Sequence, residues 1–290
     1  MNFSAALKNR DVLLLDGAIG TELDKRGLMG RASNNLDAPD VVLEIQREYA
    51  RCGCHALTAN TLTMNRVFIE THNVNVPVRD VNKAGVEIAR KAAGEGQYVL
   101  GNISSTGQLL EPYGTYREQQ LYDAFKEQVE ILAEAGVDGF IIETMFDLRE
   151  AMCALRACKD SLPLAVIVSI AFATEEKGGR TMMGNSAEQC AKDLTDEGAD
   201  AIGANCGDLG PAQMAVVVSK LHSATTLPIL AQPNAGRPKL VGDETLFDMA
   251  PESFAAGIEE CLRAGARLVG GCCGTTPEHI RAVADMLEQK

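Results

Sequence analysis

Glu134-Ala135-Gly136-Val137-Asp138-Gly139 joins the end of one expected helix to the start of one expected strand. Glycine readily lets a helix end in a left-handed turn, and the apolar residues that follow have the run length of a buried strand. The phrase returns, with substitutions, as Glu197-Gly198-Ala199-Asp200-Ala201 and as Arg263-Ala264-Gly265-Ala266-Arg267. The chain therefore repeats a unit in which a helix is followed at once by a short buried strand.

Eight apolar runs of strand length are spaced along the chain, with helical patterns between them. They cover residues 12–15, 56–59, 98–103, 139–142, 164–172, 201–204, 228–231 and 267–270. Between the third and fourth runs, residues 122–135 place Phe125, Val129 and Leu132 at helical spacing. Eight such units predict an α/β protein with a single (β/α)8 TIM barrel. Without a Pro- or Ser-rich linker, one domain is expected over residues 1–290.

An open, doubly wound sheet is the alternative architecture. It is disfavoured because no Gly-x-Gly-x-x-Gly motif follows the first expected strand. The composition also limits the partners, since a formal charge of -13 disfavours nucleic acid and anionic membranes, which reward clustered Lys and Arg. The nine cysteines are odd in number, and neither a signal peptide nor a membrane-spanning apolar run is recognisable. These features predict a cytoplasmic protein whose thiols are free or bound to a metal.

Cys272 and Cys273 stand side by side after the last apolar run, between Gly271 and Gly274. Within a strand, neighbouring side chains point to opposite faces, but at a glycine-flanked strand end both thiols can turn toward one point. Cys206 also follows an apolar run and precedes a glycine. Three converging thiols with one position left open are typical of a catalytic zinc site, whereas the alternative is three small buried core residues. The other cysteines are interpreted as core residues: Cys52, Cys54, Cys153, Cys158, Cys190 and Cys261.

Polar residues also collect at the expected strand ends. They are Asp16, Asn60, Asn102, Glu143 and Asn234, together with the three cysteines. In barrel enzymes the carboxyl ends of the strands carry the chemistry. Asp16 and Glu143 emerge directly from apolar runs, which loop composition alone does not explain. Taken alone, the two carboxylates are equally consistent with a general acid/base pair and with a binding site for an ammonium group.

Three motifs resemble one known family. They are Gly270-Gly271-Cys272-Cys273-Gly274-Thr275-Thr276-Pro277-Glu278-His279, Asn205-Cys206-Gly207 and Asp16-Gly17-Ala18-Ile19-Gly20-Thr21-Glu22. They are similar to signatures of the zinc-dependent homocysteine S-methyltransferase family, with the closest likeness to the homocysteine-binding domains of cobalamin-dependent methionine synthases. The resemblance implies homocysteine as substrate and one zinc ion per chain, bound by Cys206, Cys272 and Cys273. It also assigns the substrate's ammonium group to Asp16 and Glu143, and its carboxylate to the amides of Gly17 and Ala18.

The chemistry of a thiolate-rich zinc site agrees with this interpretation. The sulfurs neutralise the metal charge, so the site is poorly suited to activating water, but it can hold a further thiol ionised. A free alkyl thiol, with a pKa near ~8.5, is only slightly ionised at neutral pH. This chemistry predicts a zinc-bound thiol that is to be alkylated, and the family resemblance names the thiol as homocysteine and the product as methionine. Asn234 is a candidate for the fourth zinc position or for a turn cap, and Asn60 and Asn102 are candidates for the same position or for a rim contact.

The expected methyl donor is a separate methyl-cobalamin (corrinoid) protein, because the residues after Cys273 resemble the cobalamin-dependent branch of the family. The chain has no Asp-x-His-x-x-Gly segment for holding cobalamin, so the cofactor is expected only on the partner. A small donor such as S-methylmethionine or betaine is the first alternative. A non-catalytic zinc- or thiol-binding subunit is the second. A Schiff-base aldolase is disfavoured because no lysine lies within or at the end of an expected strand.

Overall fold

The computed structural model describes residues 2–29, 31–242 and 244–289. Its main sheet has eight parallel strands: β1 (Leu13–Leu14), β2 (Ala56–Thr58), β3 (Tyr98–Ile103), β4 (Gly139–Met145), β5 (Ala165–Ile170), β6 (Ala201–Asn205), β7 (Ile229–Gln232) and β10 (Ala266–Val269). They are ordered β1-β10-β7-β6-β5-β4-β3-β2. The sheet closes where Leu15 forms a bridge with Ala56, and where the Asp16 N–H donates to the Ala56 carbonyl. The predicted (β/α)8 barrel is confirmed.

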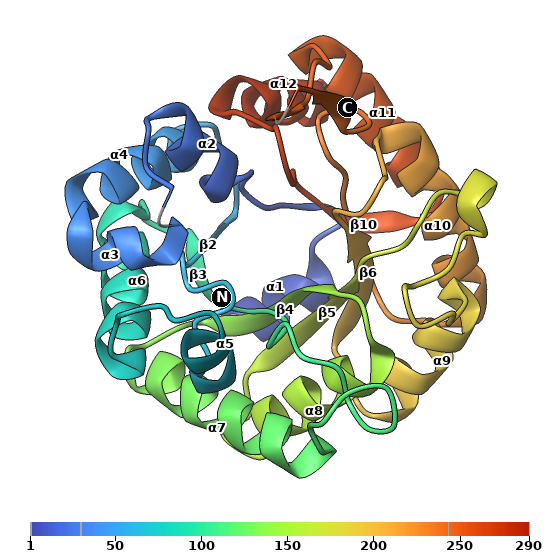
Figure 1. The fold of residues 1–290 in the computed structure, drawn as a ribbon. Helices are drawn as coiled ribbons and strands as arrows, with labels where there is room; N and C mark the ends of the chain where they lie inside the picture. Colours follow the sequence, from blue (N-terminus) through green and yellow to red (C-terminus); the bar gives the residue numbers. More distant parts are fainter. Residues whose placement is uncertain (1, 30, 243, 290) are drawn as a thin grey trace.

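Helices surround the closed sheet on its outer face (Figure 1). The longer ones are α4 (Pro39–Ala50), α6 (Val78–Ala92), α7 (Glu118–Glu134), α8 (Leu148–Lys159), α9 (Ala187–Asp196), α10 (Pro211–Ala224), α11 (Pro251–Arg263) and α12 (Pro277–Glu288). Shorter helical segments are α1 (Phe3–Asn9), α2 (Ile19–Lys25), η1 (Arg31–Ser33), α3 (Asn34–Asp37), α5 (Arg66–Thr71) and η2 (Glu175–Lys177). The helix expected over residues 122–135 lies within α7, apart from its last residue.

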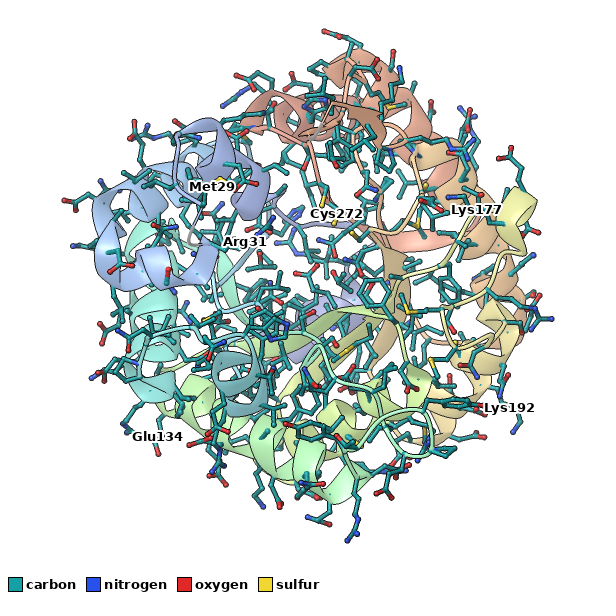
Figure 2. All side chains as sticks on the ribbon, in the orientation of Figure 1. Met29, Arg31, Glu134, Lys177, Lys192 and Cys272 are labelled. Atoms are coloured by element: carbon teal, nitrogen blue, oxygen red, sulfur yellow. The ribbon has the colours of Figure 1, made fainter. Side chains whose placement is uncertain are left out.

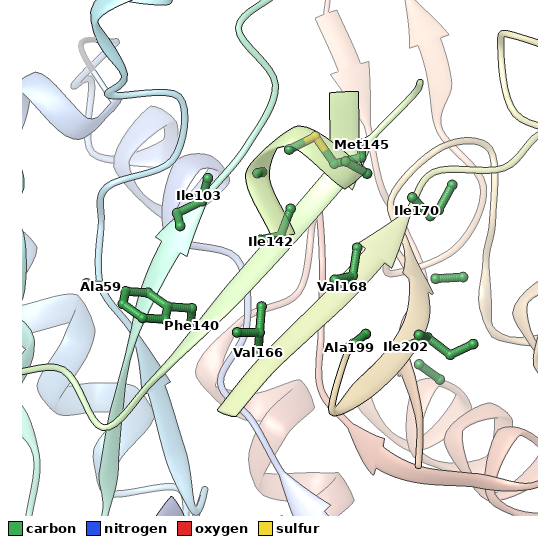
Figure 3. Close-up of a cluster of buried hydrophobic side chains, with 14 of the residues drawn as sticks. Ala59, Ile103, Phe140, Ile142, Met145, Val166, Val168, Ile170, Ala199 and Ile202 are labelled. Carbon is green, nitrogen blue, oxygen red and sulfur yellow. The ribbon is translucent and has the colours of Figure 1, made fainter. Parts of the chain in front are cut away.

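Alternate residues of the strands build two separate apolar layers. On β5, Val166 and Val168 face the helices and belong to a large outer cluster that also contains Phe140 of β4 (Figure 3). Their neighbour Ile167 belongs to an inner cluster, together with Ile141. This alternation is the period of two that a strand imposes. It explains why runs buried on both faces contain almost only apolar residues.

The amino end of the barrel is closed by the chain's first helix. Phe3, Ala6 and Leu7 of α1 are buried and share the inner cluster with Leu13 and Leu15. An apolar plug therefore fills the bottom of the barrel, and the polar strand ends face the other way. The six cysteines that were interpreted as core residues are all buried and free, which confirms that interpretation.

A second, two-stranded sheet was not expected from the sequence. Its strands, β8 (Lys239–Val241) and β9 (Glu244–Leu246), form an antiparallel hairpin in the connection from β7 to α11. The hairpin belongs to a βα connection, so it lies at the carboxyl end of the barrel. Within the part of the chain that the structure describes, no helix combines the length and the apolar character needed to cross a membrane.

Candidate metal and substrate site

Three thiols meet at the carboxyl end of the barrel. The sulfurs of Cys206, Cys272 and Cys273 all lie within 4.8 Å of one another, a spacing that could hold a metal ion. The Cys206 and Cys273 sulfurs are 3.9 Å apart. Each of the three side chains is half-buried, and Cys272 lies inside the ring of helices in Figure 2. The convergence of thiols expected from the glycine-flanked strand ends is present.

Local backbone geometry turns these thiols toward one another. Strand β6 ends at Asn205, and Cys206 then takes a left-handed conformation with φ 58°, which costs a non-glycine residue roughly 1–2 kcal/mol. After β10, the Cys272 N–H donates to the Pro233 carbonyl (2.9 Å) and the Ala235 N–H to the Cys273 carbonyl (2.9 Å). The backbone on both sides of Asn234 is thus tied to the two adjacent cysteines.

Gly207 is required by the same turn. Its φ is 60°, and a Cβ atom there would lie 2.3 Å from the carbonyl oxygen of Phe172. A side chain at this position would push the β6 turn away from its neighbour. The Asn205-Cys206-Gly207 motif therefore has a structural explanation at its third residue.

The pKa values of the three thiols depend on one another. Contact with the Cys206 and Cys272 thiols lowers the pKa of Cys273, because both can donate hydrogen bonds to its thiolate. Contacts with the side chains of Cys206, the larger cause, and of Cys273 raise the pKa of Cys272 well above its ordinary value. The cluster thus favours one thiolate stabilised by two thiols, and a cation bound there would favour ionisation of all three.

Two carboxylates lie at the same end of the barrel. Asp16 is 1% exposed; it accepts hydrogen bonds from the Thr58 N–H (2.8 Å) and the Thr58 hydroxyl. Burial outweighs these bonds and raises the pKa of Asp16 to about 8. Glu143 is half-buried, and burial raises its pKa to about 7.

No Lys or Arg forms an ion pair with Asp16 or Glu143 among the described residues. Buried carboxylates normally have a cationic partner. These two carboxylates could therefore bind the cationic group of a ligand.

The three asparagines predicted at the rim differ in their contacts. The Asn60 side-chain amide donates to Asn35 Oδ1 (2.9 Å), and the Asn60 backbone carbonyl accepts from Asn35 Nδ2 (2.6 Å). These bonds use the Asn60 side chain to stabilise the local fold. Asn102 donates to Glu143 Oε1 (2.6 Å), and Asn234 donates to the Gly207 carbonyl (2.9 Å). The Oδ1 atoms of Asn102 and Asn234 are buried without a hydrogen-bond partner. These two oxygens remain available to a ligand.

The loop after β1 is tied to the loop after β10. The Ala18 N–H donates to Thr275 Oγ1 (3.1 Å), and the Tyr49 hydroxyl donates to the Ala18 carbonyl (3.0 Å). One of the two amides expected to bind a carboxylate is therefore already used within the protein. A Cβ atom on Gly17 would lie 2.8 Å from Thr275 Oγ1, so the close approach of the two loops depends on glycine there.

Sequence reasoning missed the role of Asn205. Its side chain contacts Glu143, Thr144, Ser169 and Cys272, which come from three other strands or strand ends. The residue stood within a motif that carried the family resemblance, but no pattern in the sequence indicated what its amide group would touch.

Comparison with known proteins identifies the family and the fold of the chain. The homocysteine S-methyltransferase family profile matches residues 13–287. Methionine synthases of Mycobacterium tuberculosis and Mycobacterium leprae are 32% and 31% identical over 94% of this chain, which spans 24% of each of those relatives. The metallated form of the Escherichia coli homocysteine methyltransferase MmuM has the same fold, with a TM-score of 0.79 and 23% identity over 97% of this chain and 98% of that one. Because the profile covers nearly the whole barrel, the chain belongs to the homocysteine S-methyltransferase family of enzymes.

Proposed function

We propose that this chain, acting as one domain, binds homocysteine at the carboxyl end of the barrel and catalyses methyl transfer to its sulfur, giving methionine. The observation that carries the proposal is the meeting of two unlike half-sites. Three thiols lie within 4.8 Å of one another, and two carboxylates with raised pKa values lie at the same strand ends. A ligand with sulfur at one end and ammonium at the other matches both.

The residues fit a zinc ion. Thiolates are ligands that zinc prefers, and a tetrahedral zinc with bonds of ~2.3 Å would place its sulfurs ~3.8 Å apart. The Cys206 and Cys273 sulfurs are 3.9 Å apart, and the unpartnered Oδ1 of Asn234 belongs to a residue whose neighbours are tied to both adjacent cysteines. Cys206, Cys272 and Cys273 would hold one ion, with Asn234 as the fourth ligand before substrate arrives. Zinc bound there would supply a cationic centre that keeps the homocysteine thiol ionised at neutral pH.

The protein's own groups would hold the amino-acid end. Asp16 and Glu143, with pKa values of about 8 and about 7, would ionise as the ammonium group arrives, since an adjacent cation favours the charged form. The unpartnered Oδ1 of Asn102 would be a further acceptor for the same group. The substrate's carboxylate would meet the amides of Gly17 and Ala18, the latter sharing its N–H with Thr275. The thiolate sulfur would form the bond to the methyl carbon with its own electron pair, and the donor would keep the pair of the bond that breaks, so no protein base is needed for the transfer.

The donor we propose is a methylated corrinoid protein, with the cobalamin carried by that partner. Large apolar side chains are exposed on several loops at the carboxyl end, among them Met29 (78%), Tyr113 (72%), Met182 (73%) and Leu240 (77%). They follow β1, β3, β5 and β7 respectively. All four lie in connections at the carboxyl end of the barrel, which is the end where a protein donor would have to dock to reach the site.

The test is a methyl-transfer assay with homocysteine and four donors offered separately: a methylated corrinoid protein, free methylcobalamin, S-methylmethionine and betaine. We expect methionine from the corrinoid protein, and more slowly from free methylcobalamin. Turnover with S-methylmethionine or betaine, and none with either corrinoid donor, would contradict the proposed donor. The proposal of homocysteine as substrate would not be affected. No methionine from any donor, with zinc and homocysteine bound, would favour the non-catalytic binding subunit.

A further inference from the structure

Asn205 is fully buried at the end of β6, and both the oxygen and the nitrogen of its side-chain amide form hydrogen bonds. Its Oδ1 accepts from the Thr144 N–H (2.9 Å) and the Ser169 hydroxyl (2.8 Å). Its Nδ2 donates to Glu143 Oε2 (2.9 Å) and Thr144 Oγ1 (2.7 Å), and lies 3.7 Å from the Cys272 sulfur. One side chain therefore touches the carboxylate half-site and the thiol half-site together.

The orientation of this amide is fixed by its surroundings. A backbone N–H can only donate, so the atom facing the Thr144 N–H must be the oxygen. The nitrogen then has to face Glu143 and Cys272. Ser169 reinforces this orientation from β5, because its hydroxyl donates to the same oxygen.

On the carboxylate side, Asn205 completes a pair of neutral donors. Glu143 Oε1 accepts from Asn102 (2.6 Å) and Oε2 accepts from Asn205 (2.9 Å). Hydrogen bonds to a carboxylate favour its charged form, and neutral donors do so without cancelling its charge. The charge of Glu143 stays available to an ammonium group. The backbone bond from Thr144 also fixes the irregularity in β4 between Ile142 and Met145, where Thr144 has a φ of 57°.

On the thiol side, Asn205 is adjacent in sequence to Cys206 and in space to Cys272. Groups that hydrogen-bond to a metal's ligands fix their orientation and tune the metal, and their removal typically weakens metal affinity or activity by about 10- to 100-fold. An amide N–H directed at the Cys272 sulfur is in the position of such a group.

From this geometry we infer that Asn205 is a positioning residue that couples the two half-sites, orienting Glu143 for the substrate's ammonium group and Cys272 for the metal. The inference rests on the proposed function. Its consequence is that one substitution at Asn205 weakens two bindings at once, although the residue is expected to touch neither ligand.

The experiment measures two affinities in each protein: zinc affinity by competition with a chelator under reductant, and homocysteine affinity of the zinc-loaded chain by calorimetry. Asn205→Ala is expected to weaken both, zinc by about 10- to 100-fold, and to shift the sulfur-to-cobalt absorption bands of the cobalt-substituted chain. Asn205→Asp retains an oxygen for Thr144 and Ser169, and so keeps the bonds that hold the irregularity in β4. It is expected to fold and yet lose at least as much homocysteine affinity, because its carboxylate faces Glu143.

The matched control is Asn82→Ala on α6. Asn82 is equally buried, and its amide donates to the Met64 and Val78 carbonyls (2.8 and 2.7 Å). Its loss should lower thermal stability without changing either affinity of the folded protein. Ser169→Ala removes one bond from Asn205 and should weaken both bindings in the same direction by less. If Asn205→Ala does not fold, Ser169→Ala and Asn205→Asp are the variants that test the inference.

The outcomes separate the two claims. A parent chain that binds neither zinc nor homocysteine overturns the proposed function. A parent that binds both, with Asn205→Asp and Ser169→Ala equal to it in homocysteine and zinc affinity, overturns only the coupling role of Asn205.

Discussion

At the scale of single residues, the site is built from groups that are costly to bury. Asp16 and Glu143 have raised pKa values, and Cys206 and Thr144 are held in left-handed backbone conformations. Each of these features reduces stability in the empty protein. They occur together at the strand ends where the proposed ligands bind, which is where strained and unpaired groups are expected to serve binding.

The effect of Asp16 on stability should depend on pH. Its pKa rises from 3.8 to about 8 on folding, so the folded chain retains a proton that the unfolded chain loses. The Asp16 side chain therefore contributes fully to the free energy of unfolding below pH 3.8. This contribution is lost as the pH rises to about 8, by at most about 1.4 kcal/mol per pH unit. Asp16→Asn should therefore gain stability relative to the parent as the pH rises from 5 to 8, measured by denaturant unfolding at each pH.

Two checks accompany that measurement. Asp123→Asn, an exposed change on α7, is the control for the chemical change from Asp to Asn and is measured at the same pH values. The more stable Asp16→Asn variant should also bind homocysteine less tightly, by about 1.5–3 kcal/mol, the usual value of a hydrogen bond to a charged group. A stability difference for Asp16→Asn that does not change with pH would count against the raised pKa.

The metal ligands can be tested one at a time. Cys206→Ser, Cys272→Ser and Cys273→Ser should each lower the bound zinc well below one ion per chain, because a hydroxyl replaces a thiolate ligand. Cys190→Ser, a change at a buried free cysteine on α9, serves as the control and should keep its zinc. Metal analysis after purification under reductant gives the result, and full retention in any one of the three variants removes that residue from the site.

At the scale of elements, the strands were predictable and the rim connections were not. Each predicted strand is present, because residues buried on both faces must be apolar, and a glycine at the end of several helices marks where the helix stops, as at Gly136 (φ 89°). The β8–β9 hairpin went unpredicted because its strands are short and lie on the surface. The role of Asn205 arises from side chains on β4 and β5 and after β10, which no local pattern reveals.

The turn after β6 gives a prediction at this scale. Gly207→Ala would bring a Cβ atom 2.3 Å from the Phe172 carbonyl, whereas Gly198→Ala, also at positive φ, meets no atom within 4 Å. Gly198→Ala should cost roughly 1–2 kcal/mol from backbone conformation alone. Gly207→Ala should cost more and also weaken zinc binding, since Cys206 moves with the turn. Unfolding and chelator competition measure both, and unchanged zinc affinity in Gly207→Ala would show that the turn does not position the thiol.

At the scale of the whole molecule, barrel topology explains why the site could be located from sequence. Parallel strands bring all their carboxyl ends to one face, so Asp16, Glu143 and the cysteines had to share it once the barrel was expected. The α1 plug closes the other end. The exposed apolar side chains of that face could not be predicted, because exposure of a loop residue depends on how the loops fold over one another.

These apolar side chains give a prediction about the donor. Met182→Glu and Leu240→Glu should each reduce methyl transfer from a methylated corrinoid protein by about tenfold or more, as expected if apolar contacts in the docked complex are lost. Homocysteine affinity should not change. Leu162→Glu, at a residue that is 41% exposed in the connection from α8 to β5, is the control and should leave transfer unaffected. Transfer rates equal to that of the parent chain in Met182→Glu and Leu240→Glu, as in the control, would exclude docking through this face.

The central claim is that homocysteine reaches the chain through a sulfur–zinc bond at the three cysteines. X-ray absorption at the zinc edge, recorded on the zinc-loaded chain before and after homocysteine is added, tests it most directly. The account predicts a zinc ion bound by three sulfurs and one lighter atom before addition, and by four sulfurs afterwards, with distances near ~2.3 Å. A zinc ion with fewer than three sulfur ligands, or one whose ligands do not change when homocysteine binds, would contradict it.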